Sequence, residues 1–177
     1  MILVEWGPIS EIESIPPFGS ELEKHLNTRR GTVRHASCSA WWLLFKVLTE
    51  KKIPYGTLVF DKNGKPGFAG QSVFISLTHS KGVCAVAVSD RPVGVDVEVC
   101  RDNYLPRLID RSLTNAEKAT FDGDFTRMWC RKEAAAKLTG EGLSGYPNHI
   151  DTTELDTRFY EYRIQWDSCN YWLVAIE

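Results

Sequence analysis

Two acidic residues in the segment GVDVE (residues 94–98), Asp96 and Glu98, have a spacing that could place both carboxylates on one face of a strand. The neighbouring valines alternate with small or acidic residues, and this period of two predicts a half-buried strand. Adjacent carboxylates repel each other, and a cation between them lets both stay ionised at neutral pH. Mg²⁺, which prefers oxygen ligands, is the expected ion. The solvent-exposed face of an edge strand could have the same residue pattern without binding a metal.

A second group of chemically useful residues lies in the segment WCRKEAAAKL (residues 129–138). Its three alanines and the absence of a helix breaker predict a helix. Trp129, Glu133 and Lys137 then follow one another at intervals of one turn. The segment has two interpretations. It is either a surface helix stabilised by a Glu–Lys pair, worth about 0.2–0.5 kcal/mol, or the source of a third acid for the metal and of a lysine that faces a phosphate.

Three motifs together resemble the 4′-phosphopantetheinyl transferase superfamily, specifically its larger, pseudo-dimeric branch. They are FISLTHS (residues 74–80), GVDVE (residues 94–98) and WCRKEAAAKLTGEGL (residues 129–143), and they occur in the family's order. The resemblance is good over residues 60–145 and poor at the ends of the chain. Ser76 stands where the family commonly has Asn, so a shorter side chain replaces the amide at that position.

The resemblance implies a transferase, a holo-[carrier protein] synthase that needs Mg²⁺. Such an enzyme moves the 4′-phosphopantetheine arm of coenzyme A to a serine of an acyl or peptidyl carrier protein. The nucleophile then belongs to the partner, which agrees with the lack of a GxSxG motif in this chain. Two alternatives remain open at this point: a metal-dependent nuclease or phosphatase that uses the same acids, and a non-catalytic protein that binds coenzyme A.

By this resemblance Asp96, Glu98 and Glu133 are the expected metal ligands. Asp96, Glu133 and Lys137 are the expected catalytic residues. Glu133 would accept the serine proton directly or through a water molecule, and Lys137 would face a phosphate oxygen.

A larger set of residues is expected to contact coenzyme A. His79, flanked by two hydroxyl groups, would hold a phosphate, and Lys132 would point either to the carrier protein or to the phosphate. The basic cluster before residue 35 is explained equally well by a solvated helix face, and GKP (residues 64–66) by its turn alone. The complete expected set is His79, Thr78, Ser80, Lys132, Lys137, Arg29, Arg30, Arg34, Lys65 and Pro66.

The expected fold is α+β, with two similar subdomains forming a pseudo-dimer. The chain of 177 residues would divide into an N-terminal half on the coenzyme A side (residues 1–95) and a C-terminal half with the metal and the catalytic helix (residues 96–177), in one compact unit. A faint repeat supports this division, because a helix-bearing segment precedes an apolar closing strand in each half.

Sequence patterns also predict individual elements. Strands are expected at residues 1–6, where Gly7-Pro8 would stop the strand, and at residues 159–166 and 171–176. A hairpin is expected at residues 73–88, and helices at residues 37–49 and 106–112. The residues expected to cap helices are Thr114 with Glu117, Asp124 and Gly140.

Composition limits the class of protein. The formal charge of −2 gives no reason to expect nucleic acid as the main ligand. The five cysteines are widely spaced and lack a CxxC pair, which favours a reducing compartment, and we expect a cytoplasmic monomer. Neither a signal peptide nor a membrane span is predicted.

Overall fold

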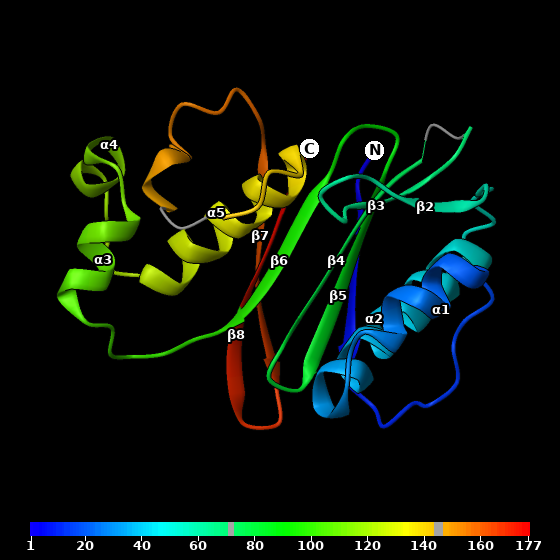
Figure 1. The fold of residues 1–177 in the computed structure, drawn as a ribbon. Coiled ribbons are helices and arrows are strands. Elements are labelled where there is room, and N and C mark those ends of the chain that lie inside the picture. Colours follow the sequence, from blue (N-terminus) through cyan, green and yellow to red (C-terminus); the bar gives the residue numbers. More distant parts are fainter. Residues whose placement is uncertain (71–72, 144–146) are drawn as a thin grey trace.

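The computed structural model describes residues 1–70, 73–143 and 147–177. Its first half contains one sheet with the strand order β1-β5-β4 and one two-stranded sheet, β2-β3 (Figure 1). Helix α2 covers the larger sheet, and their common core includes Trp41, Leu44, Ile75 and Val86. The elements are β1 (Leu3–Pro8), α1 (Ser20–Asn27), α2 (Gly31–Glu50), β2 (Leu58–Phe60), β3 (Pro66–Phe68), β4 (Phe74–Ser80) and β5 (Val83–Ser89).

The second half contains one sheet with the order β6-β8-β7 and a long helix, α5, that lies on it. Cys130, Ala134 and Ala135 of α5 pack against Val174 and Ile176 of the sheet. The elements are β6 (Gly94–Val99), α3 (Pro106–Ser112), α4 (Asn115–Ala119), α5 (Phe125–Thr139), the 3₁₀-helix η1 (Pro147–His149), β7 (Phe159–Trp166) and β8 (Cys169–Ile176).

The two three-stranded sheets have the same topology. In each sheet the first strand pairs antiparallel with the last, the last pairs antiparallel with the middle one, and a long helix lies between the first and middle strands in the chain. The mixed helix and strand content confirms the predicted α+β class. The division at residues 95 and 96 remains a prediction, which the common topology supports.

Strands β4 and β6 lie side by side although they belong to different sheets (Figure 1). Side chains connect them: the Val95 amide donates to Ser76 Oγ at 3.1 Å, and Thr78 Oγ1 donates to Asp96 Oδ1 at 2.9 Å. On the other face of β6, Val95 and Val97 belong to a core shared with Ala85 of β5. The alternation along β6 therefore points its valines into this core and its acids away from it.

Two predicted element boundaries are wrong. Strand β1 continues through Gly7 and Pro8, because β1 is an edge strand in which a missing proline N–H can face away from the ladder. Helix α2 begins at Gly31 rather than at residue 37. Its first turn is largely exposed, so it has no apolar periodicity for the sequence to reveal.

The predicted helix caps are confirmed. Thr114 and Glu117 form a complete capping box at the start of α4, and Asp124 Oδ1 accepts a hydrogen bond from the Arg127 amide at 3.0 Å. Gly140 ends α5 in the left-handed conformation with φ of 78°. Over the described ranges, no helix is both long and apolar enough to span a membrane.

Gly94 sets the distance between α5 and β6. A Cβ atom at this position would lie 1.9 Å from the Ala134 carbonyl oxygen and 2.7 Å from the Leu138 nitrogen. Both of these are backbone atoms of the helix, which no side-chain rotation can move. The absence of a side chain at residue 94 therefore brings Glu133 and Lys137 close to Asp96.

We predict that Gly94→Ala lowers the free energy of unfolding by about 1–3 kcal/mol, because the helix must move away from the strand. The measurement is urea unfolding followed by circular dichroism. Gly7→Ala is the matched control, because a Cβ at residue 7 would meet no atom within 4 Å. Equal midpoints for the two variants would contradict the prediction.

Candidate active site

A pocket with a volume of about 650 Å³ is lined by residues of both halves. Its acidic residues are Asp96 and Glu98 from β6 and Glu133 from α5. Arg29 and His79 from the N-terminal half also line it. The structure thus brings together the three acids that the sequence predicts as metal ligands.

Asp96 lies at the centre of the polar contacts in this pocket. The residue is only 4% exposed, and its Oδ1 accepts from Thr78 Oγ1 at 2.9 Å and from Lys137 Nζ at 2.7 Å. Its Oδ2 accepts from the Cys130 thiol at 3.3 Å. Three donors from two elements, β4 and α5, therefore fix both oxygens of this buried acid.

The negative charge of Asp96 also acts on the other two acids, Glu98 and Glu133. Burial raises the pKa of Glu98 and that of Glu133, and in each case the negative charge of Asp96 raises the pKa further. Lys137 lowers both pKa values, and the Ser80 hydroxyl, which donates to Glu98 Oε2 at 3.0 Å, lowers that of Glu98. The three acids therefore hold more negative charge than the one lysine neutralises.

This donor set fits a hard divalent cation such as Mg²⁺, because all the available ligand atoms are carboxylate oxygens. In the described parts of the chain, no three His, Cys, Asp or Glu side chains already have the geometry of a metal site. Lys137 instead contacts Asp96 and supplies a positive charge there. The assignment of Asp96, Glu98 and Glu133 as metal ligands remains a proposal.

The N-terminal half contributes nitrogen-bearing groups to the pocket. Burial lowers the pKa of His79, the charges of Lys137 and Arg29 lower it further, and the charge of Asp96 raises it. Arg29 Nη2 lies 2.9 Å from His25 Nε2, and the His25 ring stacks on Phe60 with 4.5 Å between ring centroids. A neutral imidazole and a guanidinium suit a phosphate or another anionic group.

The turn between β2 and β3 connects the N-terminal half to the end of α5. Lys65 Nζ donates to the Leu138 carbonyl at 2.7 Å, and Asn63 Nδ2 donates to the Gly140 carbonyl at 2.9 Å. Lys65 and Pro66 also line the pocket. The turn therefore has both a structural role and a place at the pocket wall, as the two interpretations of GKP expected.

Thr78 and Ser80 have partners that the sequence did not predict. Their hydroxyl groups donate to Asp96 and Glu98, and each hydroxyl has only one proton to donate. Their contact with coenzyme A remains a prediction. Ser76, which stands in place of the family's Asn, accepts from the Val95 amide and so helps to connect the two halves.

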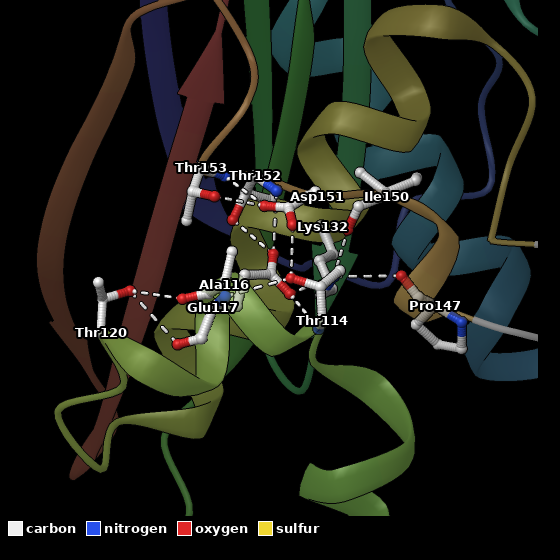
Figure 2. A network of polar contacts seen from close by, with 10 residues as sticks. All are labelled: Thr114, Ala116, Glu117, Thr120, Lys132, Pro147, Ile150, Asp151, Thr152 and Thr153. Atoms are coloured by element: carbon white, nitrogen blue, oxygen red, sulfur yellow. Dashed lines mark hydrogen bonds and ion pairs between the residues drawn. The ribbon is translucent and has the colours of Figure 1, made fainter.

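Lys132 is not part of the pocket. Its side chain is fully buried and forms an ion pair with Glu117 at 2.7 Å (Figure 2). The prediction that it faces the carrier protein or a phosphate is wrong, because its helix position directs it toward α4 instead.

Two of the three expected arginines also lie outside the pocket lining. Arg34 donates to the Leu26 carbonyl at 2.8 Å and to Asn27 Oδ1 at 3.3 Å, which ties α1 to α2. Arg30 is exposed at the N-cap of α2. Of these three arginines only Arg29 has the expected position, because Arg29 and Arg30 lie between the two helices whereas Arg34 lies within α2 and faces the end of α1.

Sequence reasoning missed several residues that line the pocket, and one, Cys130, that contacts its acids from outside the lining. His25 and Phe60 lie far apart in the chain, and no local pattern connects them. Cys130 lies inside the recognised motif, but its contact with Asp96 depends on the rotation of α5. Ser37, whose Oγ lies 3.5 Å from His79 Nε2, could be found only from the position of α2 beside β4.

Residues 92–174 match the family model described as the 4′-phosphopantetheinyl transferase superfamily, so the match includes Asp96, Glu98, Glu133 and Lys137. This match covers just under half of the chain and shows its similarity to the superfamily. The chain is 37% identical over 124 residues to the 4′-phosphopantetheinyl transferase AcpT of Salmonella typhi, which covers 61% of this chain and 60% of AcpT. These similarities support the resemblance that the three motifs indicated.

Two further relatives in the superfamily align with a larger and a smaller part of the chain. The 4′-phosphopantetheinyl transferase psf-1 of Bacillus pumilus is 29% identical over 150 residues, or 76% of this chain and 63% of psf-1. HetI of Nostoc sp. is 31% identical over 102 residues, or 48% of this chain and 42% of HetI. The chain therefore spans less than two thirds of the length of each of these relatives.

We predict that Mg²⁺ raises the melting temperature more at about pH 8 than at about pH 5. The raised pKa values of Glu98 and Glu133 mean that the folded protein holds their protons more tightly than the unfolded chain does. Without metal, stability should therefore fall as the pH rises through these pKa values. Mg²⁺ binds the ionised carboxylates and offsets that loss, so its stabilising effect should grow over the same range.

Differential scanning fluorimetry with and without Mg²⁺ across this pH range makes the measurement. Asp96→Asn is the control, since it removes one charged ligand but keeps the shape of the side chain. A Mg²⁺ effect of the same size in this variant would show that the ion binds elsewhere.

Proposed function

We propose that this protein transfers the 4′-phosphopantetheine arm of coenzyme A to a serine hydroxyl of an acyl or peptidyl carrier protein, with Mg²⁺ as cofactor. The observation that carries the proposal is the shared pocket. Asp96, Glu98, Glu133 and Lys137 line it together with Arg29 and His79. The activity printed in the names of the matched relatives agrees with this proposal. We further propose that the protein acts as a cytoplasmic monomer.

The proposed reaction is a displacement at phosphorus. The serine oxygen forms a bond to the β-phosphorus of coenzyme A, the bond from that phosphorus to the bridging oxygen breaks, and adenosine 3′,5′-bisphosphate leaves. Reactions of this kind depend on positioning and on charge neutralisation more than on covalent catalysis. When bound by the three acids, Mg²⁺ would neutralise the pyrophosphate and make the leaving phosphate less basic.

Glu133 is the proposed base for the serine proton. Its raised pKa brings its basicity closer to neutral pH than that of an ordinary glutamate, which suits proton transfer. Asp96, whose two oxygens already accept three hydrogen bonds, is better suited to hold the metal than to accept a proton. The two acids thus have different roles because their surroundings differ.

Lys137 is proposed to move between two anionic partners. Its ammonium contacts Asp96 and is 31% exposed, so it can reach a ligand in the pocket. An ammonium about 4 Å from a phosphate oxygen is worth about 4 kcal/mol at an effective dielectric constant of 20. Mg²⁺ at Asp96 would free Lys137 for this contact by replacing its positive charge.

Arg29 and His79 are proposed to hold a phosphate of coenzyme A. The planar guanidinium can donate two parallel hydrogen bonds to phosphate oxygens, and a neutral imidazole can donate one. The pocket volume of about 650 Å³ also falls in the range of about 300–1,000 Å³ that is typical of small-molecule sites.

We predict that the protein modifies an apo carrier protein when both are incubated with coenzyme A and Mg²⁺. Mass spectrometry of the carrier should show the mass gain of one phosphopantetheine arm. Cleavage of nucleic acid or of a phosphoester would support the nuclease or phosphatase alternative. Coenzyme A binding with an unmodified carrier would support the non-catalytic alternative, and either result would reject the transferase.

We predict that Asp96→Asn lowers the rate of transfer about 10²-fold or more, because the metal loses a charged ligand. The rate is measured by the same mass assay, and circular dichroism checks that the variant is folded. Glu154→Ala is the control, since Glu154 is an exposed acid outside the pocket lining. An unchanged rate in Asp96→Asn would remove Asp96 from the site.

A further inference from the structure

A completely buried ion pair lies beside the pocket but outside its lining. Lys132 Nζ of α5 contacts Glu117 Oε2 of α4 at 2.7 Å, and neither side chain has any exposed surface (Figure 2). The transfer mechanism uses neither residue. A buried pair of charges requires good geometry and further hydrogen bonds, because both groups have lost their hydration.

The structure supplies those hydrogen bonds on both sides. The Lys132 ammonium donates to the Pro147 carbonyl at 3.2 Å and to the Ile150 carbonyl, so all its three protons have partners. Glu117 Oε2 also accepts from the Thr114 amide at 2.9 Å. Glu117 Oε1 accepts from the Thr152 amide at 3.0 Å and from the Thr152 hydroxyl at 2.6 Å.

These contacts connect three segments that are separate in the chain: α4, α5 and residues 147–152 (Figure 2). A buried ion pair is weak evidence for stability, because apolar residues of the same size often stabilise as well or better. The buried pair differs from apolar contacts in that its hydrogen bonds depend on angle. It therefore fixes the orientation of the groups that it joins. Lys132 therefore limits the rotation of α5 about its own axis.

The apolar contacts of α5 constrain its distance from the sheet more than its rotation. Ala134 and Ala135 present short side chains to β8, and Gly94 permits the close approach to β6. Small apolar surfaces of this kind have no preferred direction. Polar contacts supply it: Cys130 and Lys137 bond to Asp96, and Lys132 anchors the helix to α4.

Lys132 directly precedes Glu133, so any rotation of α5 at this point moves the Glu133 carboxylate. Side chains extend about 5–6 Å from a helix axis. A rotation of roughly 10° would thus displace that carboxylate by about 1 Å, and a misplacement of this size can lower a rate about 10²-fold.

We infer that Lys132 and Glu117 are positioning residues, which orient α5 so that Glu133 and Lys137 face Asp96 across the pocket. This inference rests on the proposed function. It predicts a change in turnover rather than in coenzyme A binding, because neither Lys132 nor Glu117 lines the pocket.

The test uses Lys132→Met and the double variant Glu117→Gln/Lys132→Met. The single variant leaves a buried glutamate without its cation and should lose stability for that reason alone, whereas the double variant removes both charges and should recover stability. Arg131→Met is the matched control. Arg131 is the adjacent residue of α5, and its ion pair with Glu161 is partly exposed, at 25% and 21%.

We expect the double variant to be folded, with kcat at least about 10-fold lower and KM for coenzyme A within about twofold of the unaltered protein. Arg131→Met should keep both constants within about twofold. A folded double variant with unaltered kcat would overturn the inference. A change in KM alone would also overturn it.

A crystal structure of the double variant tests the inference without any assay of transfer. We expect the Glu133 carboxylate to shift by about 1 Å or more relative to Asp96, and an unchanged position would overturn the inference. If the unaltered protein transfers no phosphopantetheine, the proposed function fails. The position of Glu133 in the double variant then still decides whether the buried pair orients the helix.

Discussion

The side-by-side arrangement of β4 and β6 is the constraint on which the rest of the structure depends. These strands belong to different sheets, and hydroxyl groups of β4 connect them through bonds to the backbone and carboxylates of β6. The valines of β6 enter the shared core, so its acids must face the other way. The pocket forms where this acidic face meets residues from both halves.

The charges in the pocket explain why it suits a cation and an anionic ligand together. Asp96 has Lys137 as its partner, whereas burial and the charge of Asp96 raise the pKa of Glu98 and of Glu133. A divalent ion would relieve this repulsion. Arg29 and Lys137 supply positive charge, and both lower the pKa of His79. One cavity therefore contains both carboxylates that suit a metal and cationic groups that suit phosphates.

Helix α5 contributes to both sets of groups, and different contacts control its position. Gly94 lets the helix approach β6, the turn carrying Asn63 and Lys65 holds its C-terminal end, and Lys132 anchors it to α4. The catalytic assignment of Glu133 depends on all of these contacts, although none of them involves Glu133 itself. The chemistry of one carboxylate thus depends on residues from positions 63 to 150.

Local sequence patterns determined most of the secondary structure and the acidic part of the site. Alternation in GVDVE predicted both the strand and the common face of Asp96 and Glu98, and the capping residues marked the ends of α4 and α5 correctly. These features depend on neighbours in the chain, whose geometry is set by the period of a strand or helix. The resemblance to the superfamily and the α+β class were likewise predictable from motifs and patterns.

Only the tertiary structure decided which polar side chains meet. The sequence placed Lys132 next to Glu133 and could not show that its ammonium is buried against Glu117, fifteen residues away in another helix. It could not show that Thr78 donates to Asp96, or that Arg29 alone of three arginines lines the pocket. Such contacts depend on the rotation of helices and the stacking of sheets, which packing between distant segments fixes and local periodicity does not.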